Sequence, residues 1–131
     1  MTQQIKRPLG PLAEKMGVEI TRLDDECCIC EMPVDGNTQP IGILHGGANG
    51  VLGETAGSVL AVHHAPPGWR ALGARLEMNH RKPVREGTVN CKATLESSEG
   101  RKRWYRLECR NERGETYAEG RLLTVDIEHS G

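Results

Sequence analysis

Only one segment of this chain has the residue spacing of a long helix, so the rest is expected to fold around it. From about Gly47 to His63, apolar side chains recur at intervals of three and four, as on one side of an α-helix. The run Ala65-Pro66-Pro67-Gly68 then ends the helix, because proline cannot continue it. The expected apolar side consists of Ala48, Val51, Leu52, Thr55, Val59 and Leu60.

Short strands separated by turns are expected on either side of this helix. After it, strands are predicted near 71–80, 87–97, 102–112 and 115–125, with glycine-containing turns between them. Before it, we predict a short helix at Leu12 to Met16, two strands within 18–34 joined at Asp24-Asp25, and a turn and loop over 35–44. An antiparallel sheet has one face to cover and the helix can cover it, so the predicted fold class is α+β.

Composition limits the size of the core and the kind of partner. At 131 residues the chain is expected to form one domain, 1–131, whose residues 1–10 are a flexible N-terminal segment. Hydrophobic residues make up 37% and aromatic residues 3%, with no Phe, so the core is expected to be thin and to be completed by a second copy. The net charge of −1 gives no bulk attraction to nucleic acid or to an anionic membrane, and neither is an expected partner.

The five cysteines and the N-terminal residues bear on compartment and metal binding. Residues 1–10 contain no apolar run typical of a signal peptide, and no stretch approaches the ~20 apolar residues of a membrane span. A cytoplasmic protein with free thiols is therefore expected. Cys27-x-x-Cys30 has the spacing of half a zinc site, but no second pair of Cys or His completes it, so no metal site is expected.

Small residues surround one carboxylate on the long helix. Glu54 is the only large side chain on a stripe with offsets of three, four and seven. Each glycine costs a helix about 1 kcal/mol relative to alanine, so several together indicate close packing or room for a narrow ligand. A solvated helix glutamate is the alternative interpretation of Glu54. The stripe consists of Gly47, Gly50, Glu54, Gly57, Ser58 and Ala61.

The residues His45-Gly46-Gly47 stand where this helix begins. Free N–H groups and the positive end of the helix dipole point outward there, so a carbonyl oxygen at this site would be polarised, as in an oxyanion hole. Glu54, two turns further along, has the chemistry to attack a carbonyl or to activate a water. Thioester hydrolysis needs few catalytic groups because the thiolate leaves readily, so a polarised carbonyl and one carboxylate suit it. His-Gly-Gly alone is a weak motif.

Three runs of sequence resemble the hotdog-fold acyl-CoA thioesterases. Residues 39–48 read Gln-Pro-Ile-Gly-Ile-Leu-His-Gly-Gly-Ala, and residues 54–58 read Glu-Thr-Ala-Gly-Ser. Residues 76–84, Leu-Glu-Met-Asn-His-Arg-Lys-Pro-Val, resemble the family's strand after the helix. The resemblance covers roughly residues 10–125. It is strongest to the subgroup with Glu on the helix, which includes 4-hydroxybenzoyl-CoA, dihydroxynaphthoyl-CoA and enterobactin-proofreading thioesterases.

This resemblance implies both a fold and an activity. The fold is a sheet of about six antiparallel strands wrapped around the helix, with a homodimer as the smallest unit and a homotetramer expected. The activity is hydrolysis of an acyl-CoA or acyl-carrier thioester, with an aromatic acyl group as one option, and it uses no cofactor beyond the thioester substrate. The active site would form between subunits, with the helix start and the carboxylate contributed by different chains.

The resemblance also gives each matched residue an expected role. Glu54 is the nucleophile or the general base, and the Gly47 N–H polarises the thioester carbonyl with help from His45. The supporting residues are Gln39, which orients nearby groups, Ser58, which helps place the water, and His80, which lies near the acyl group. Structural roles stand as alternatives for four residues: a loop hydrogen bond for His45, tight packing for Ser58, a surface position for His80 and a turn before Pro40 for Gln39.

Two basic clusters remain, Arg81-Lys82 with Arg85, and Arg101-Lys102-Arg103. Charge runs are usually solvated faces, but in a CoA-using hotdog protein such residues often hold the nucleotide phosphates. The predicted substrate-binding cations are therefore Arg81, Lys82 and Arg101. Trp104 and Tyr105 beside the second cluster are expected to serve packing rather than nucleic-acid stacking.

The main alternative function is a non-catalytic acyl-CoA-sensing hotdog module. A fused DNA-binding region would favour it, and the first ten residues leave no room for one. A hydratase would carry a different helix-start motif. Gly50 and Gly53 stand where bulkier residues are expected in close relatives, which bears on the shape of the acyl pocket.

Overall fold

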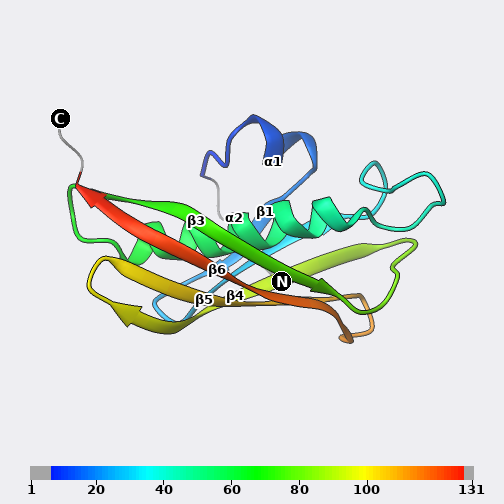
Figure 1. Cartoon of the computed structure of the whole chain (residues 1–131). Coiled ribbons are helices and arrows are strands. Elements are labelled where there is room, and N and C mark those ends of the chain that lie inside the picture. The colour runs from blue at the N-terminus through cyan, green and yellow to red at the C-terminus, as the bar shows by residue number, and fades with distance from the viewer. Residues whose placement is uncertain (1–6, 129–131) are drawn as a thin grey trace.

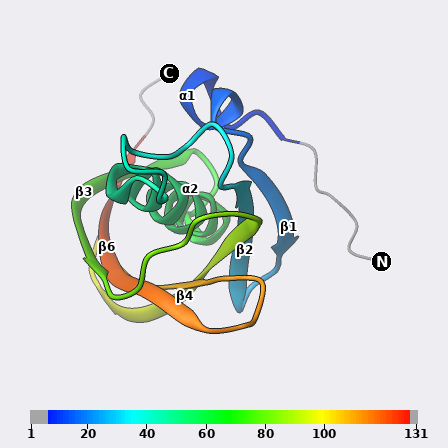
Figure 2. The same cartoon turned by 90° about the vertical axis from the view of Figure 1, so that its right-hand side faces the viewer.

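The computed structural model describes residues 7–128, so most of the segment predicted to be flexible, residues 1–10, lies outside the described residues. The six strands form one sheet in which every neighbouring pair is antiparallel, in the order β1-β2-β4-β5-β6-β3. The sheet curls around α2, which lies along its concave face, and the short α1 lies on the outer side of α2 (Figures 1 and 2). The elements are α1 (Pro11–Lys15), β1 (Glu19–Leu23), β2 (Cys27–Pro33), α2 (Gly46–His64), β3 (Trp69–His80), β4 (Thr88–Glu99), β5 (Lys102–Arg110) and β6 (Thr116–Glu128).

The predicted α+β architecture, six antiparallel strands around one long helix, is confirmed. The ends of the four strands predicted after the helix shift by no more than three residues. The predicted turn at Asp24-Asp25 is also present, and its cause is local. The Asp24 carboxylate accepts hydrogen bonds from the N–H groups of Glu26 and Cys27, at 2.8 and 3.0 Å, which reverses the chain between β1 and β2. No helix within residues 7–128 is long and apolar enough to cross a membrane.

The side of α2 that faces the sheet differs in part from the predicted apolar side. Val51 and Thr55, predicted to be apolar contacts, are only half-buried on the outer side of the helix. Glycine and alanine take much of the inner side, because a sheet curled this tightly brings its own side chains close to the helix backbone. The buried residues of α2 are Ala48, Asn49, Leu52, Gly53, Ala56, Gly57, Val59, Leu60 and Ala61.

The small-residue stripe predicted on α2 divides between two sides of the helix. Gly57 is buried, and a Cβ atom there would lie 2.7 Å from Leu122 Cδ2 in β6. Glu54 is exposed and Ser58 half-buried, so both face outward. Gly57 and Ser58 follow Glu54 by three and four residues. Because a helix has 3.6 residues per turn, these two neighbours point in directions 100° apart, so they do not share one side of the helix. Glycine here serves close packing on one side and leaves open space on the other.

Two glycines of α2 make this difference measurable. A Cβ atom at Gly53 would lie 2.7 Å from Met78 Cε and 2.9 Å from Leu107 Cδ1, whereas at Gly50 the nearest atom, Leu76 Cδ2, lies at 3.4 Å. Alanine gains helix propensity at both positions, but overpacking costs about 1–3 kcal/mol only at Gly53. We therefore expect Gly53→Ala to be less stable than Gly50→Ala by about 1–3 kcal/mol in urea unfolding. Equal stability of the two variants would contradict this packing.

Sulfur and tyrosine fill much of the core beneath α2. The side chains of Cys30, Cys91 and Cys109 lie side by side across β2, β4 and β5, and all three are fully buried. A hydrogen bond with Cys109, together with burial, raises the pKa of the Cys91 thiol well above its ordinary value. Tyr105 and Tyr117 are the largest fully buried side chains. All five cysteines are free and buried.

One edge of the sheet is long and carries exposed apolar side chains. β3 is twelve residues long and pairs only with β6, which leaves its other edge unpaired within residues 7–128. Leu72 is 51% exposed and Leu76 is 36% exposed along this strand. A long, apolar and unpaired edge is a template for pairing with another chain.

Candidate active site

The start of α2 is capped by the side chain of His45. His45 has extended backbone angles, and its Nδ1 accepts a hydrogen bond of 2.8 Å from the N–H of Gly47. Because Nδ1 accepts, the proton of the neutral imidazole is on Nε2. The structure thus contains the hydrogen bond between His45 and the backbone that was expected if His45 has a structural role. The Gly47 N–H predicted to polarise a carbonyl already donates to His45 Nδ1. A substrate oxygen at this position has to displace the imidazole or share the N–H with it.

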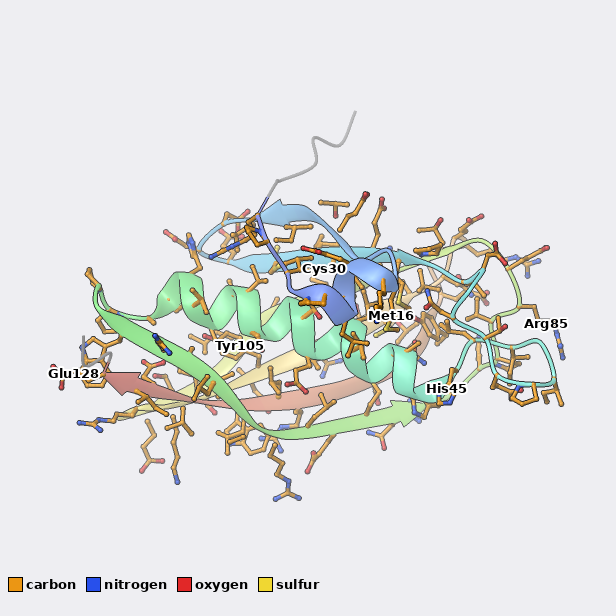
Figure 3. The ribbon with its side chains drawn as sticks, turned by 90° about the horizontal axis from the view of Figure 1, so that it is seen from above. Met16, Cys30, His45, Arg85, Tyr105 and Glu128 are labelled. Carbon is orange, nitrogen blue, oxygen red and sulfur yellow. The ribbon has the colours of Figure 1, made fainter. Side chains whose placement is uncertain are left out.

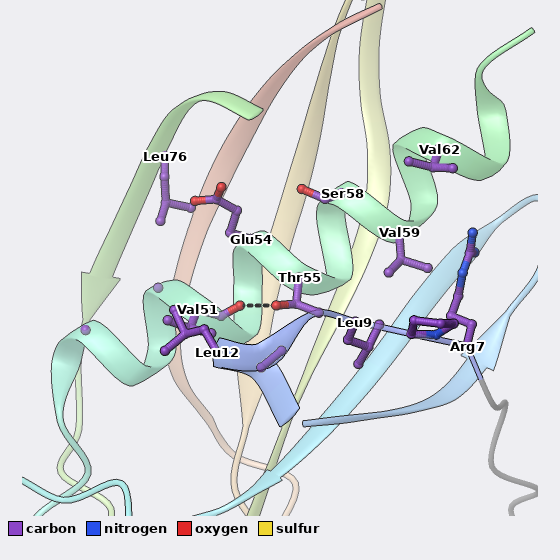
Figure 4. Close-up of a pocket in the computed structure, with 14 residues that line it drawn as sticks. Arg7, Leu9, Leu12, Val51, Glu54, Thr55, Ser58, Val59, Val62 and Leu76 are labelled. Atoms are coloured by element: carbon purple, nitrogen blue, oxygen red, sulfur yellow. Dashed lines mark hydrogen bonds between the residues drawn. The ribbon is translucent and has the colours of Figure 1, made fainter. Parts of the chain in front are cut away.

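Glu54 and Ser58 project from successive turns of α2 to the same side of the helix (Figure 4). Glu54 is exposed, and a Cβ atom at Gly73 in β3 would lie 3.1 Å from its Oε2, so the carboxylate rests against the edge strand. Within residues 7–128 no cation forms an ion pair with Glu54. The carboxylate is therefore available to a ligand.

The cleft that contains this carboxylate has a volume of about 630 Å³. Leu76 flanks Glu54 on one side, and Leu9 and Leu12 approach from the α1 segment on the other (Figure 4). Its walls are mainly apolar, with few polar groups beside the carboxylate, which is the usual composition of a pocket for an organic ligand. The residues of α2 that line it are Gly47, Gly50, Val51, Glu54, Thr55, Ser58, Val59 and Val62.

Gly47 and Glu54 line the same cleft from positions two turns apart on α2. Seven residues at 1.5 Å each separate them by about 10 Å along the helix axis. A nucleophile or an activated water has to reach about 3–3.5 Å from the carbonyl carbon. For both groups of one chain to act on the same carbonyl, the Glu54 side chain would have to span most of this separation.

Four other predicted residues line a second cleft, of about 380 Å³, at the start of α2. The Gln39 side chain accepts a 2.6 Å hydrogen bond from the Ile41 N–H, so its oxygen stabilises the turn around Pro40, as the structural alternative expects. His80 lies close to Gly46, where a Cβ atom would be 2.9 Å from His80 Nε2. The predicted residues lining this cleft are Gln39, His80, Arg81 and Lys82.

The two basic residues of the second cleft already have acidic partners. Arg81 Nε donates to Glu119 at 3.1 Å, and Lys82 Nζ donates to Glu115 at 3.2 Å. The hydrogen bond from Arg81 lowers the pKa of Glu119; hydrogen bonds from Asn111 and then Lys82 lower that of Glu115. All of these side chains are at least partly exposed, so the pairs are open to exchange with phosphate.

Arg101 lies far from the other predicted site residues of the same chain. Its guanidinium sits over the ring of Trp69, at 4.9 Å from the centroid. Trp69 pairs with Glu128, which lies at the end of the molecule opposite His45 (Figure 3). Arg103, from the same basic cluster, forms an ion pair of 2.6 Å with the buried Asp126 beneath the end of α2. The second basic cluster is thus divided between a surface stacking contact and a buried ion pair.

Sequence reasoning missed two polar residues beside the second cleft, Asn49 and Tyr117. Asn49 is 4% exposed and accepts a hydrogen bond of 2.8 Å from the Tyr117 hydroxyl. Asn49 is the one polar side chain among the buried residues of α2, and the apolar side predicted from the sequence did not include it. Among residues 7–128 no group of three or more His, Cys, Asp or Glu side chains is placed to hold a metal ion.

Comparison with known proteins agrees with this architecture. Residues 41–118 match the sequence profile of the thioesterase superfamily, which is more than half of the chain. Over 82 residues the chain is 40% identical to the proofreading thioesterase EntH of Cronobacter turicensis, covering 62% of this chain and 60% of that protein. The EntH of Cronobacter sakazakii is 38% identical over the same length and coverage. The chain thus spans about 60% of the length of these curated relatives.

Solved structures share the whole fold. A thioesterase from Haemophilus influenzae superposes with a TM-score of 0.89 and 26% identity, covering 100% of this chain and 98% of that one. A mutant thioesterase from Pseudomonas aeruginosa has a TM-score of 0.86 and 25% identity over 89% of this chain and 86% of that one. The resemblance read from the helix start and its carboxylate is confirmed. The chain belongs to the thioesterase superfamily and has the hotdog fold.

Proposed function

We propose that this protein hydrolyses acyl thioesters, with Glu54 supplying the catalytic carboxylate. The observation that carries the proposal is the exposed Glu54 in a mainly apolar cleft, on the helix whose first turn bears His45 and Gly47. The apolar walls suit an acyl chain or ring, and the helix start offers N–H groups to the thioester oxygen. The similarity to proofreading thioesterases supports the same reaction.

Two routes are open to Glu54, and both end in the same products. In one, a carboxylate oxygen bonds to the thioester carbon, the thiolate leaves, and water hydrolyses the resulting anhydride. In the other, Glu54 takes a proton from a water as that water attacks the carbonyl, and the thiolate then leaves with the proton. In the proposed mechanism Ser58, one turn along on the same side, hydrogen-bonds the attacking water. The Gly47 N–H stabilises the oxyanion once the carbonyl displaces His45 Nδ1.

We further propose that the working unit is at least a dimer, built so that the Gly47 end of one helix meets the Glu54 of its partner. The axial separation of about 10 Å between the two groups within a chain supports this arrangement. The unpaired edge of β3, with exposed Leu72 and Leu76, offers a surface for the partner, and Glu54 rests against that strand. A homotetramer built from two such dimers remains our expectation.

The substrate proposed is a CoA or carrier-protein thioester, with an aromatic acyl group as one option. Arg81 and Lys82 are exposed at the second cleft and are candidates for the phosphates, as is Arg101 if the partner subunit brings it near the site. The free thiols fit a reducing compartment, and we propose the cytoplasm.

A hydrolysis screen tests the proposed function. The purified full chain is offered aromatic, short-chain and long-chain acyl-CoAs and acyl-carrier thioesters, and thiol release is followed by absorbance. We expect turnover with at least one class. If no thioester is hydrolysed, the enzymatic proposal fails. Tight acyl-CoA binding without turnover would support the non-catalytic binding module instead.

A further inference from the structure

Asn49 forms hydrogen bonds at both ends of its side-chain amide. It is buried on the inner side of α2, and its Oδ1 accepts a 2.8 Å hydrogen bond from the Tyr117 hydroxyl of β6. Its Nδ2 lies 3.2 Å from Nδ1 of His80, the last residue of β3. One amide therefore joins a buried phenol to an exposed imidazole.

The direction of these hydrogen bonds determines the tautomer of His80. Burial raises the pKa of Tyr117, so its hydroxyl stays a neutral donor. Because the phenol donates to Oδ1, the NH₂ group of Asn49 faces His80 Nδ1, which then accepts. The reverse orientation of the amide would leave the phenol proton to the Cys109 sulfur, which is a weak acceptor. The neutral His80 ring therefore carries its proton on Nε2.

The Nε2 atom of His80 points to the start of α2. A Cβ atom at Gly46 would lie 2.9 Å from it, so the ring occupies space that only glycine leaves free. Gly46, Asn49 and His80 all line the second cleft. The Nε2–H group is thus presented beside the helix turn that is proposed to hold the thioester carbonyl.

We propose that Asn49 and Tyr117 are positioning residues that hold His80 in its Nε2–H tautomer, so that it donates a hydrogen bond to an acceptor atom of the bound substrate. The expected effect on hydrolysis rests on the proposed function, whereas the tautomer of His80 follows from the hydrogen bonds of Asn49 alone. Asn49 and Tyr117 act through His80 and need no contact with substrate themselves.

Nitrogen NMR of the unliganded protein tests the tautomer directly. In the wild type we expect a protonated Nε2 and an unprotonated Nδ1 for His80. Asn49→Asp keeps the shape and still accepts from Tyr117, but its second oxygen accepts rather than donates, so the proton moves to Nδ1. The matched control is Asn79→Asp, which adds the same charge at the exposed neighbouring position of β3 and should leave Nε2 protonated. Protonated Nδ1 in the wild type would overturn the proposal.

Tyr117→Phe provides a second variant, since a buried aspartate carries a risk of misfolding. Loss of the phenol proton frees the Asn49 amide to turn over, so both imidazole tautomers should become populated. An unchanged Nε2–H signal in this folded variant would show that Tyr117 does not orient the amide.

A double-mutant cycle then separates positioning from simple packing. We expect Asn49→Ala to lower kcat/KM about tenfold, the value of one hydrogen bond of about 1.4 kcal/mol. In a His80→Ala background the same change should cost no further activity. Additive losses would show that Asn49 acts independently of His80. If the wild type hydrolyses no thioester, the proposed function fails, while the NMR result still decides the tautomer.

Discussion

Glu54→Gln is expected to lower kcat by about 1,000-fold while leaving the protein folded and able to bind substrate. The amide has the size of the carboxylate but is neither a nucleophile nor a base, so either proposed route stops. Glu54 is exposed and has no ion-pair partner among residues 7–128, so its charge contributes little to folding. The measurements are thiol release under saturating substrate, calorimetric binding of the substrate or a thioether analogue, and the Tm.

The matched control is Glu86→Gln, which removes the same charge from an exposed loop residue outside both clefts. We expect its kcat and Tm to equal those of the wild type. Full activity of Glu54→Gln would refute the catalytic carboxylate while leaving the hotdog fold untouched. A large fall in Tm would instead show that the carboxylate has a structural role against β3.

The fold was predictable where local patterns and turn chemistry agree. The single helix is marked by its spacing and by the prolines after Ala65, and each later turn contains a glycine that the structure places at positive φ, at residues 87, 100 and 114. The order of strands in the sheet was not predictable from these signals. β3 pairs with β6 across a long stretch of chain, and such pairing depends on tertiary packing rather than on local sequence.

The candidate site was predictable as a set of residues but not as a geometry. Residue types and spacing identified the helix start and Glu54. Offsets of three and four were assigned to one side of the helix, although residues at those two offsets differ in direction by 100°. Gly57 consequently packs on β6, while Ser58 faces the cleft. Asn49 went unnoticed because its partners Tyr117 and His80 are distant in sequence and meet only in the folded sheet.

The most consequential feature of the site is the length of helix between its two chemical ends. Gly47 and Glu54 lie on one rigid element, which fixes an axial separation of about 10 Å between their backbones. In the proposed dimer, a second copy related by a two-fold axis presents the opposite end of its own helix to each half-site. In the proposed dimer, the exposed edge of β3 beside Glu54 is the surface on which the partner pairs.

Mixing two inactive variants should therefore restore activity. Glu54→Gln lacks the carboxylate, and Gly47→Pro lacks the N–H at a first-turn position where proline is tolerated in a helix. Each homodimer has two defective sites. A mixed dimer has one site with both defects and one with neither. After co-refolding at equal amounts, half of the dimers are mixed, so about a quarter of the wild-type activity should return.

The reciprocal mixture supplies the control for this complementation. Wild type is co-refolded with an equal amount of the double variant that carries both substitutions in one chain. If sites are shared between subunits, both sites of every mixed dimer are defective, and about a quarter of the activity per total chain remains. If each site lies within one chain, about half remains, and the two single variants stay inactive when mixed. If sites are shared, mixing raises the activity of the two single variants and lowers that of the wild type mixed with the double variant. Misfolding of Gly47→Pro would not produce this pair of results, because the first mixture would then show no recovery.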